Sequence, residues 1–186
     1  MSTTVSWPAS ATLLLLISVA VNVVQASRIH SLLETPKEHL APLGEPARAI
    51  EGSAISGEAA RVAFDDGRPT VVYYFNSDCR WCERNWPNAE ALAAAAGDRF
   101  RFVAVTAEPD VRDFAAARGF GFEIIQRVTD ESRRAFGFRG TPHTVVVSSQ
   151  GIITHEWVGA YDTAHRRQIE RLFDVPLPGL ETMSPR

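Results

Sequence analysis

The most constraining feature of this 186-residue sequence is the pattern of a buried strand that leads directly into a pair of cysteines. Residues 70–75 read TVVYYF and are almost entirely β-branched or aromatic. Such a run is typical of a strand that is buried on both faces of a sheet. Cys79 and Cys82 follow, and an alanine- and leucine-rich pattern predicts a helix over residues 81–96. The sequence therefore predicts that both cysteines lie where a strand passes into a helix.

The rest of the chain, from about residue 46, alternates between strand and helix patterns. An early hairpin is expected within residues 47–64. Further along the chain we expect strands at 100–106 and 123–128, helices at 110–118 and 130–136, a hairpin of strands 144–148 and 152–158, and a closing helix at 163–173. This order predicts an α/β fold, a three-layer α/β/α sandwich around a central mixed sheet.

The first 27 residues contain no Asp, Glu, Lys or Arg, and residues 11–24 are almost all apolar. A helix over residues 8–27 would rise about 30 Å, which is the thickness of a bilayer core. We therefore expect an N-terminal transmembrane anchor that passes through the lipid bilayer. A cleaved signal peptide is the alternative, because residues 24–26 (VQA) resemble a cleavage site. In either case the rest of the chain would be exported.

These patterns divide the chain into four expected segments. They are the anchor or signal peptide (1–27), a linker (28–45), a globular domain (46–175) and a frayed tail (176–186). The net charge of −3 shows no basic surplus, so no nucleic-acid partner is expected. Two cysteines are too few for a disulfide-rich secreted scaffold.

The spacing of the cysteines indicates redox chemistry. Cys79 is expected at the start of the helix, where unpaired N–H groups and the helix dipole stabilise a thiolate. Cys82 lies one turn further on, so it is able to close a disulfide with Cys79 and resolve a mixed intermediate. Such exchange needs no cofactor beyond the Cys79–Cys82 disulfide, and no metal is expected. Half of a zinc site, a structural disulfide, and a copper-binding thiol pair with His143 as third ligand are the alternatives.

Thr141 and Pro142 directly precede the strand pattern of residues 144–148. A cis bond between them would turn the proline ring toward the sulfurs and expose the Thr141 backbone to an extended substrate chain. An ordinary trans proline at a strand start is the alternative. His143 follows, and we expect a partly exposed strand histidine there, with a role near the thiols as the alternative.

Together these motifs resemble a thioredoxin-like fold: the strand TVVYYF, the motif CRWC, the helix proline Pro87 and the ending TPHTVVV. The sequence GEP at 44–46, the segment 107–136 and the N-terminal anchor resemble the TlpA/ResA-like branch of membrane-anchored thiol–disulfide oxidoreductases. The resemblance covers about residues 43–175.

This resemblance implies a cis bond before Pro142 and an exported enzyme that exchanges its dithiol with protein disulfides, acting as a reductant. It also implies a membrane electron donor and a domain on the periplasmic side, or a soluble periplasmic form after signal cleavage. A peroxiredoxin-type peroxidase and a copper-binding thiol chaperone are the alternative functions. A peroxidase would carry Thr three residues before its reactive cysteine, where this chain has Asn76.

The chain departs from the family at the buried thiol. Tyr73 stands where thioredoxins carry a buried Asp, and Asn85 stands where many TlpA-like reductases carry a Glu. The proton of Cys82 would then have to pass to Glu108, to a water molecule or to the partner.

Near the motif, Asp78 is expected to disfavour the Cys79 thiolate and Arg80 to favour it. Trp81 is expected to form a docking surface. The side chains of Glu83 and Arg84 are expected to be solvated, and those of Trp86 and Trp157 to lie in the core.

Overall fold

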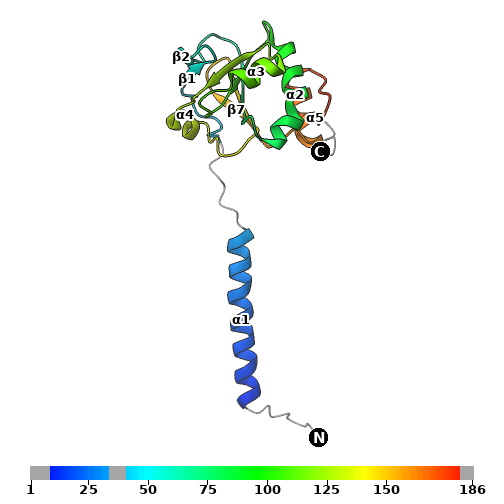
Figure 1. Ribbon diagram of the computed structural model, residues 1–186. Coiled ribbons are helices and arrows are strands. Elements are labelled where there is room, and N and C mark those ends of the chain that lie inside the picture. The colour runs from blue at the N-terminus through cyan, green and yellow to red at the C-terminus, as the bar shows by residue number, and fades with distance from the viewer. Residues whose placement is uncertain (1–8, 34–40, 181–186) are drawn as a thin grey trace. The chain divides into compact units, whose positions relative to one another are not determined.

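The computed structural model describes residues 9–33 and 41–180, which form two separate units (Figure 1). The first unit is helix α1 (Ala9–Leu33). Its stretch from Ala11 to Arg28 has a mean hydropathy of 1.6 and is long and apolar enough to cross a membrane. The leucine and valine side chains between Leu13 and Val24 are exposed. Signal sequences share this length and composition, so the helix agrees with both the anchor and the signal peptide.

The second unit is built on one sheet. The described residues of this domain form seven strands in the order β2-β1-β5-β4-β3-β6-β7. Strands β3, β4 and β5 run parallel, and the other pairs are antiparallel. The strands are β1 (Ile50–Ala54), β2 (Ala59–Val62), β3 (Thr70–Tyr74), β4 (Arg101–Val105), β5 (Glu123–Gln126), β6 (His143–Val147) and β7 (Ile153–Val158). This confirms the predicted mixed sheet.

Helices cover both faces of the sheet. One face packs against α2 (Arg80–Ala96), α3 (Arg112–Arg118) and α5 (Thr163–Phe173), and its core includes Trp86 and Trp157. The other face packs against α4 (Asp130–Ala135) and a second set of apolar side chains. In Figure 1, α2 and α5 lie to the right of the sheet and α4 to the left. The predicted three-layer α/β/α sandwich is therefore confirmed.

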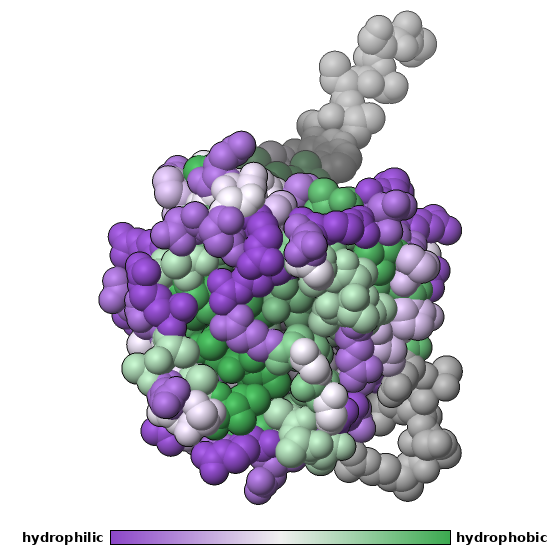
Figure 2. Space-filling model, turned by 90° about the horizontal axis from the view of Figure 1, so that it is seen from above, coloured by the Kyte–Doolittle hydropathy of each residue, from purple (hydrophilic) through white to green (hydrophobic). Residues whose placement is uncertain are grey.

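The alternating side chains of β3 connect the two cores. Val71 and Tyr73 face the α2 side, and Val72 and Tyr74 face the α4 side, all of them buried. Because both faces are covered, the strand carries no polar alternation, as its sequence indicated. Figure 2 shows one face of the domain, where hydrophilic residues surround a patch of hydrophobic ones.

The ends of the domain differ from the expected segments. Residues 28–33 belong to α1, while Ala41 is buried and its N–H donates to the Glu156 carboxylate at 2.8 Å. At the other end Leu177 is buried, and the N–H of Gly179 donates to Asn88 at 2.8 Å. The expected linker and frayed tail are therefore wrong for residues 41–45 and 176–180, which pack on the domain. Residues 34–40 and 181–186 of those segments lie outside the described residues.

We expect Leu177→Ala to lower the free energy of unfolding by about 2–3 kcal/mol, because it empties a buried position next to α5. Leu172→Ala is the matched control. That side chain is 40% exposed, so the change should cost no more than about 0.5 kcal/mol. Urea unfolding of the two variants measures the difference. Equal effects would contradict the packing of this segment.

Candidate active site

The two cysteines lie at the start of α2, just beyond the end of β3. Cys79 is the N-cap of the helix, with an extended backbone, and its Sγ accepts a hydrogen bond from the N–H of Cys82 at 3.2 Å. A thiolate at this position gains the first-turn N–H as a donor and the positive end of the helix dipole. The Cys79 side chain is half-buried, so a second chain can reach it.

Cys82 is one turn further along α2 and is fully buried. Burial raises the pKa of its thiol well above the usual range, and a hydrogen bond with Cys79 raises it further. In this structure both cysteines are free thiols. The pair therefore consists of one accessible sulfur on a helix cap and one protonated sulfur beneath it.

The loop before β6 brings a backbone carbonyl to the accessible sulfur. The Sγ of Cys79 lies 3.3 Å from the carbonyl oxygen of Thr141, to which the thiol donates. The Thr141–Pro142 peptide bond is cis, which confirms the expectation from the resemblance. Pro142 is buried and Thr141 is half-buried. Within residues 41–180, the backbone N–H of Thr141 has no backbone hydrogen-bond partner.

A neutral polar network surrounds Asn85, where the sequence resemblance led us to note a missing carboxylate. Asn85 is fully buried, and its amide nitrogen donates to the Tyr73 hydroxyl at 3.2 Å. The amide oxygen of Asn85 accepts from Asn88 at 2.9 Å and from the N–H of Tyr161 at 3.0 Å. The Tyr161 hydroxyl in turn is 2.7 Å from the hydroxyl of Thr144. The sequence indicated the missing carboxylate, but only the structure shows that Asn88, Tyr161 and Thr144 join this network.

Tyr73 connects this network to the thiols. Burial raises the pKa of its phenol, and the neighbouring Cys82 raises it further, so the phenol remains protonated at neutral pH. Burial also raises the pKa of Tyr161. None of these groups is therefore able to accept the proton of Cys82 at neutral pH.

Glu108 supports the loop before the motif. One of its carboxylate oxygens accepts from the Ser77 N–H at 3.0 Å, and the other accepts from the Ser77 hydroxyl at 2.8 Å. Among the described residues, no hydrogen bond joins Glu108 to either cysteine. Asp78 and Arg80, on either side of Cys79, are both exposed.

Trp81 lies between the cysteines and is 51% exposed. The guanidinium of Arg84 stacks over its ring at 5.0 Å, and Arg84 is half-buried. Glu83 and Arg84 were expected to be solvated, but both are half-buried, and the Arg84 cation covers one side of the indole. Trp86 and Trp157 are buried, as predicted.

His143 was expected to be partly exposed, and this prediction is wrong. Its side chain is buried and its Nε2 lies 2.6 Å from a carboxylate oxygen of Glu156. His143 is the register partner of Tyr74 in the neighbouring strand, and its ring packs edge-on against Phe138. The His143 side chain therefore faces the α4 side of the sheet rather than the thiols. Among the described residues, no group of three or more His, Cys, Asp or Glu side chains could hold a metal ion.

We compared this structure with solved structures to identify the fold of the domain. The chain is 24% identical to a thioredoxin-family thiol:disulfide interchange protein from Chlorobium tepidum TLS, with a TM-score of 0.57, over 69% of this chain and 95% of that one. It is 22% identical to StoA from Bacillus subtilis, with a TM-score of 0.54, over 70% and 97% of the two chains. The domain has a thioredoxin-like fold.

A third thioredoxin-like neighbour is the exposed lipoprotein thioredoxin Etrx1 from Streptococcus pneumoniae TIGR4. It is 16% identical with a TM-score of 0.55, over 67% of this chain and 99% of that one. No protein-family model matches the sequence, and no curated protein matches it. The likeness to thioredoxin-like structures therefore concerns the fold.

The raised pKa of Cys82 predicts a pH-dependent stability for the reduced protein. In the unfolded chain a cysteine titrates at about 8.5, and in the folded domain the pKa of Cys82 is higher. Below about pH 8.5 the contribution of the protonated Cys82 thiol to the free energy of unfolding is fully present. Above that value the folded state holds the proton that the unfolded state loses, so the free energy of unfolding falls, by up to about 1.4 kcal/mol per pH unit.

Urea unfolding between about pH 8.5 and 10 measures this slope, since the tyrosines Tyr73 and Tyr161 add to it only above about pH 10. Cys82→Ala should remove it, whereas Cys79→Ala, which leaves the buried thiol in place, should retain it. An unchanged slope in Cys82→Ala would contradict the burial of a protonated thiol.

Proposed function

We propose that this protein is an exported thiol–disulfide oxidoreductase that uses Cys79 and Cys82 to reduce disulfides in partner proteins. The observation that carries the proposal is the accessible Cys79 sulfur, which caps α2 at 3.2 Å from the Cys82 N–H and lies 3.3 Å from the Thr141 carbonyl. The fold of the solved thiol:disulfide interchange proteins supports the same chemistry.

In the first step the Cys79 thiolate attacks one sulfur of the substrate disulfide. The substrate S–S bond breaks, a mixed disulfide forms with Cys79, and the other substrate sulfur leaves as a thiolate. The first-turn N–H of Cys82 stabilises the attacking sulfur before the reaction. The half-buried Thr141 offers its backbone N–H for pairing with the substrate chain.

In the second step Cys82 loses its proton and attacks the Cys79 sulfur. The mixed disulfide breaks, the second substrate sulfur leaves as a thiolate, and a Cys79–Cys82 disulfide remains. The substrate has gained two electrons and the Cys82 proton, and its second thiolate takes a proton from solvent, which balances the proton that Cys79 lost on becoming a thiolate. Because Tyr73 and Asn85 present no carboxylate, the thiolate released in the first step is the base that takes the Cys82 proton. A dithiol donor, which we expect at the membrane, then reduces the new disulfide.

We propose that the domain acts on the extracytoplasmic side and is held there by α1. The apolar stretch from Ala11 to Arg28 supports a membrane location. The exposed lipoprotein thioredoxin with the same fold supports a tethered, outward-facing arrangement. The proposed segments are then an N-terminal anchor, a linker and a thioredoxin-like domain that extends from Ala41 to Leu180.

The order of the two thiols predicts which variant traps the substrate. Cys82→Ser retains the attacking sulfur but is unable to resolve the mixed disulfide, so it should accumulate a covalent complex with a disulfide-containing protein such as insulin. Cys79→Ser should accumulate none, because the remaining sulfur is fully buried. Non-reducing electrophoresis separates the two results. A complex formed by Cys79→Ser alone would reverse the assignment, and a complex formed by neither variant would contradict the function.

Because the base for Cys82 is the released substrate thiolate and not a group of the protein, the second step should accelerate with increasing pH, as more of that thiolate stays deprotonated. Asn85→Asp should supply a base, because burial raises the pKa of the new carboxyl toward neutrality while its oxygens still accept from Asn88 and Tyr161. We expect resolution of the mixed disulfide near pH 6 to accelerate about tenfold and its pH profile to flatten. Asn88→Asp places the same charge one turn further along α2 and is the matched control. Equal pH profiles for wild type and Asn85→Asp would contradict the mechanism.

A further inference from the structure

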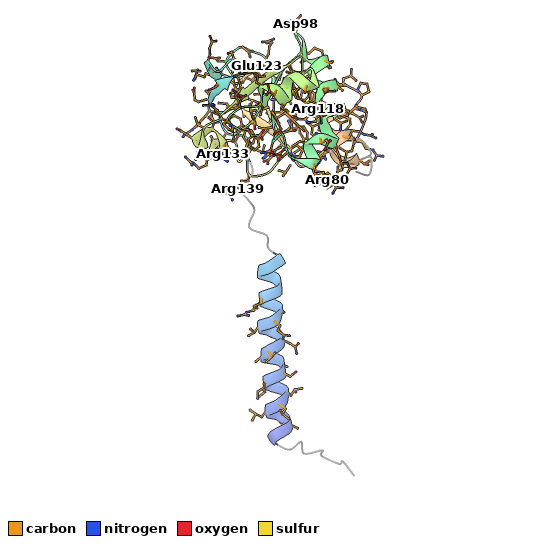
Figure 3. All side chains as sticks on the ribbon, viewed as in Figure 1. Arg80, Asp98, Arg118, Glu123, Arg133 and Arg139 are labelled. Atoms are coloured by element: carbon orange, nitrogen blue, oxygen red, sulfur yellow. The ribbon has the colours of Figure 1, made fainter. Side chains whose placement is uncertain are left out.

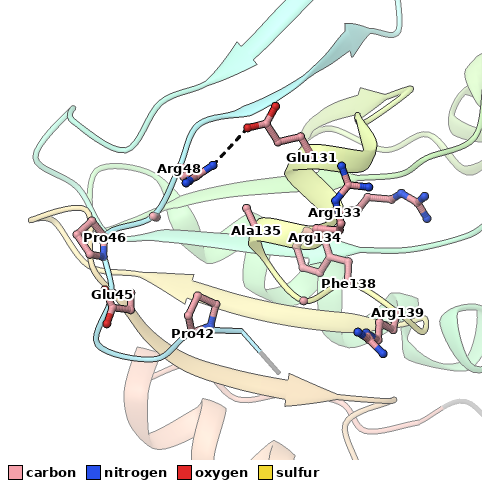
Figure 4. Close-up of a pocket in the computed structure, with 12 residues that line it drawn as sticks. Pro42, Glu45, Pro46, Arg48, Glu131, Arg133, Arg134, Ala135, Phe138 and Arg139 are labelled. Atoms are coloured by element: carbon pink, nitrogen blue, oxygen red, sulfur yellow. Dashed lines mark hydrogen bonds and ion pairs between the residues drawn. The ribbon is translucent and has the colours of Figure 1, made fainter. Parts of the chain in front are cut away.

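Beside the Thr141–Pro142 loop the domain carries an open groove with a volume of about 960 Å³ (Figure 4). Its lining comes from the chain between Pro42 and Arg48, from α4, and from residues 137–139. Phe138 is buried and stacks against Tyr74 at 4.7 Å, so this side of the groove rests on the core. The groove is therefore a formed feature of the domain, outside the thiol site already described.

The groove is rich in arginine. Its charged lining residues are Arg48, Arg133, Arg134, Arg139, Glu45 and Glu131. The Glu131 carboxylate forms an ion pair with the Arg48 guanidinium at 3.3 Å, and Arg133 forms an ion pair with Asp130. Between residues 41 and 180, no carboxylate forms an ion pair with Arg134 or Arg139, and the buried Nε of Arg133 has no hydrogen-bond partner. The groove thus holds four arginine side chains against two lining carboxylates, and the neighbouring Asp130 interacts with Arg133 and Arg134.

The position of Arg139 relates the groove to the thiols. Only Gly140 separates Arg139 from Thr141, whose carbonyl lies 3.3 Å from the Cys79 sulfur. Two residues of chain span at most about 7 Å. Figure 3 shows Arg139 and Arg80 at the same edge of the domain, with Asp98 at the opposite edge. A substrate chain that pairs with Thr141 and continues past Arg139 would therefore enter the groove.

We propose that this groove binds acidic side chains of the protein substrate, located about two to five residues from its reacting cysteine. The assignment rests on the proposed function, since it needs a substrate chain held at Thr141. An extended chain advances about 3.3 Å per residue, so two to five residues cover about 7–17 Å beyond the residue held at Thr141. Arginine matches carboxylates well, because its planar guanidinium presents paired donors. The groove then selects substrates by charge and accelerates their association.

The test compares the full chain in neutral detergent with two double variants of equal charge change. Arg134→Glu/Arg139→Glu reverses the groove arginines. Arg167→Glu/Arg171→Glu reverses two exposed arginines on α5, outside the groove, and is the matched control. The probes are a peptide with one disulfide flanked by three aspartates, the same peptide with three lysines, and the neutral small disulfide bis(2-hydroxyethyl) disulfide.

At low salt the wild type should reduce the aspartate peptide about tenfold faster, in kcat/KM, than the lysine peptide. Arg134→Glu/Arg139→Glu should lose this preference and leave reduction of the neutral disulfide unchanged. The α5 control should keep the preference, and added salt should weaken it. A preference that survives in the groove variant, or that disappears equally in the α5 control, would overturn the assignment.

A binding measurement separates failure of the groove from failure of the proposed function. The aspartate peptide with serine in place of its cysteines is titrated into the full chain, so that no exchange is needed. If the wild type binds this peptide and Arg134→Glu/Arg139→Glu does not, the groove assignment is supported. If the wild type also fails to reduce the neutral disulfide, the proposed function alone is contradicted. Absence of binding overturns the groove assignment. Displacement of the peptide by an equal concentration of inorganic phosphate would also overturn it, in favour of a small-anion site.

Discussion

The hydrogen bond from the Cys82 N–H to the Cys79 sulfur is the interaction on which the rest of the site depends. It caps α2 and at the same time holds the accessible sulfur in the field of the helix. β3 ends at Tyr74, and the Cys79 cap starts α2 five residues further along the chain. One turn of helix then buries Cys82 beneath the cap, so the same short segment produces an exposed and a buried thiol.

The neutral network around Asn85 leaves the buried thiol of this site without a protein base. A carboxylate in that position would provide a base for the buried thiol, whereas the amide and the Tyr73 phenol only hold one another in place. The network also extends to the end of the domain, since Asn88 accepts from the N–H of Gly179. Packing of the C-terminal segment and the environment of Cys82 are therefore linked through buried hydrogen bonds, which are costly to break.

Most of the fold followed from local patterns. The run TVVYYF predicted β3 because a strand covered on both faces has no need of polar residues, and the cysteine spacing predicted the start of α2. The burial of His143 could not be predicted in this way, because its partner Glu156 lies on the neighbouring strand β7 and the pairing depends on sheet register. The packing of Leu177 likewise depends on a tertiary contact. Asn88 and Tyr161 joined the network for the same reason, and the groove arginines are brought together from separate segments.

The central claim is that the Cys79–Cys82 pair reduces its partners, and the reduction potential of the pair tests this most directly. A protonated, buried Cys82 gives the reduced form little thiolate stabilisation beyond that of the capping sulfur. The account therefore predicts a potential near that of thioredoxin, about −270 mV, when the full chain is equilibrated with dithiol buffers. A potential near that of DsbA, about −120 mV, would contradict it, because such a pair would oxidise its partners.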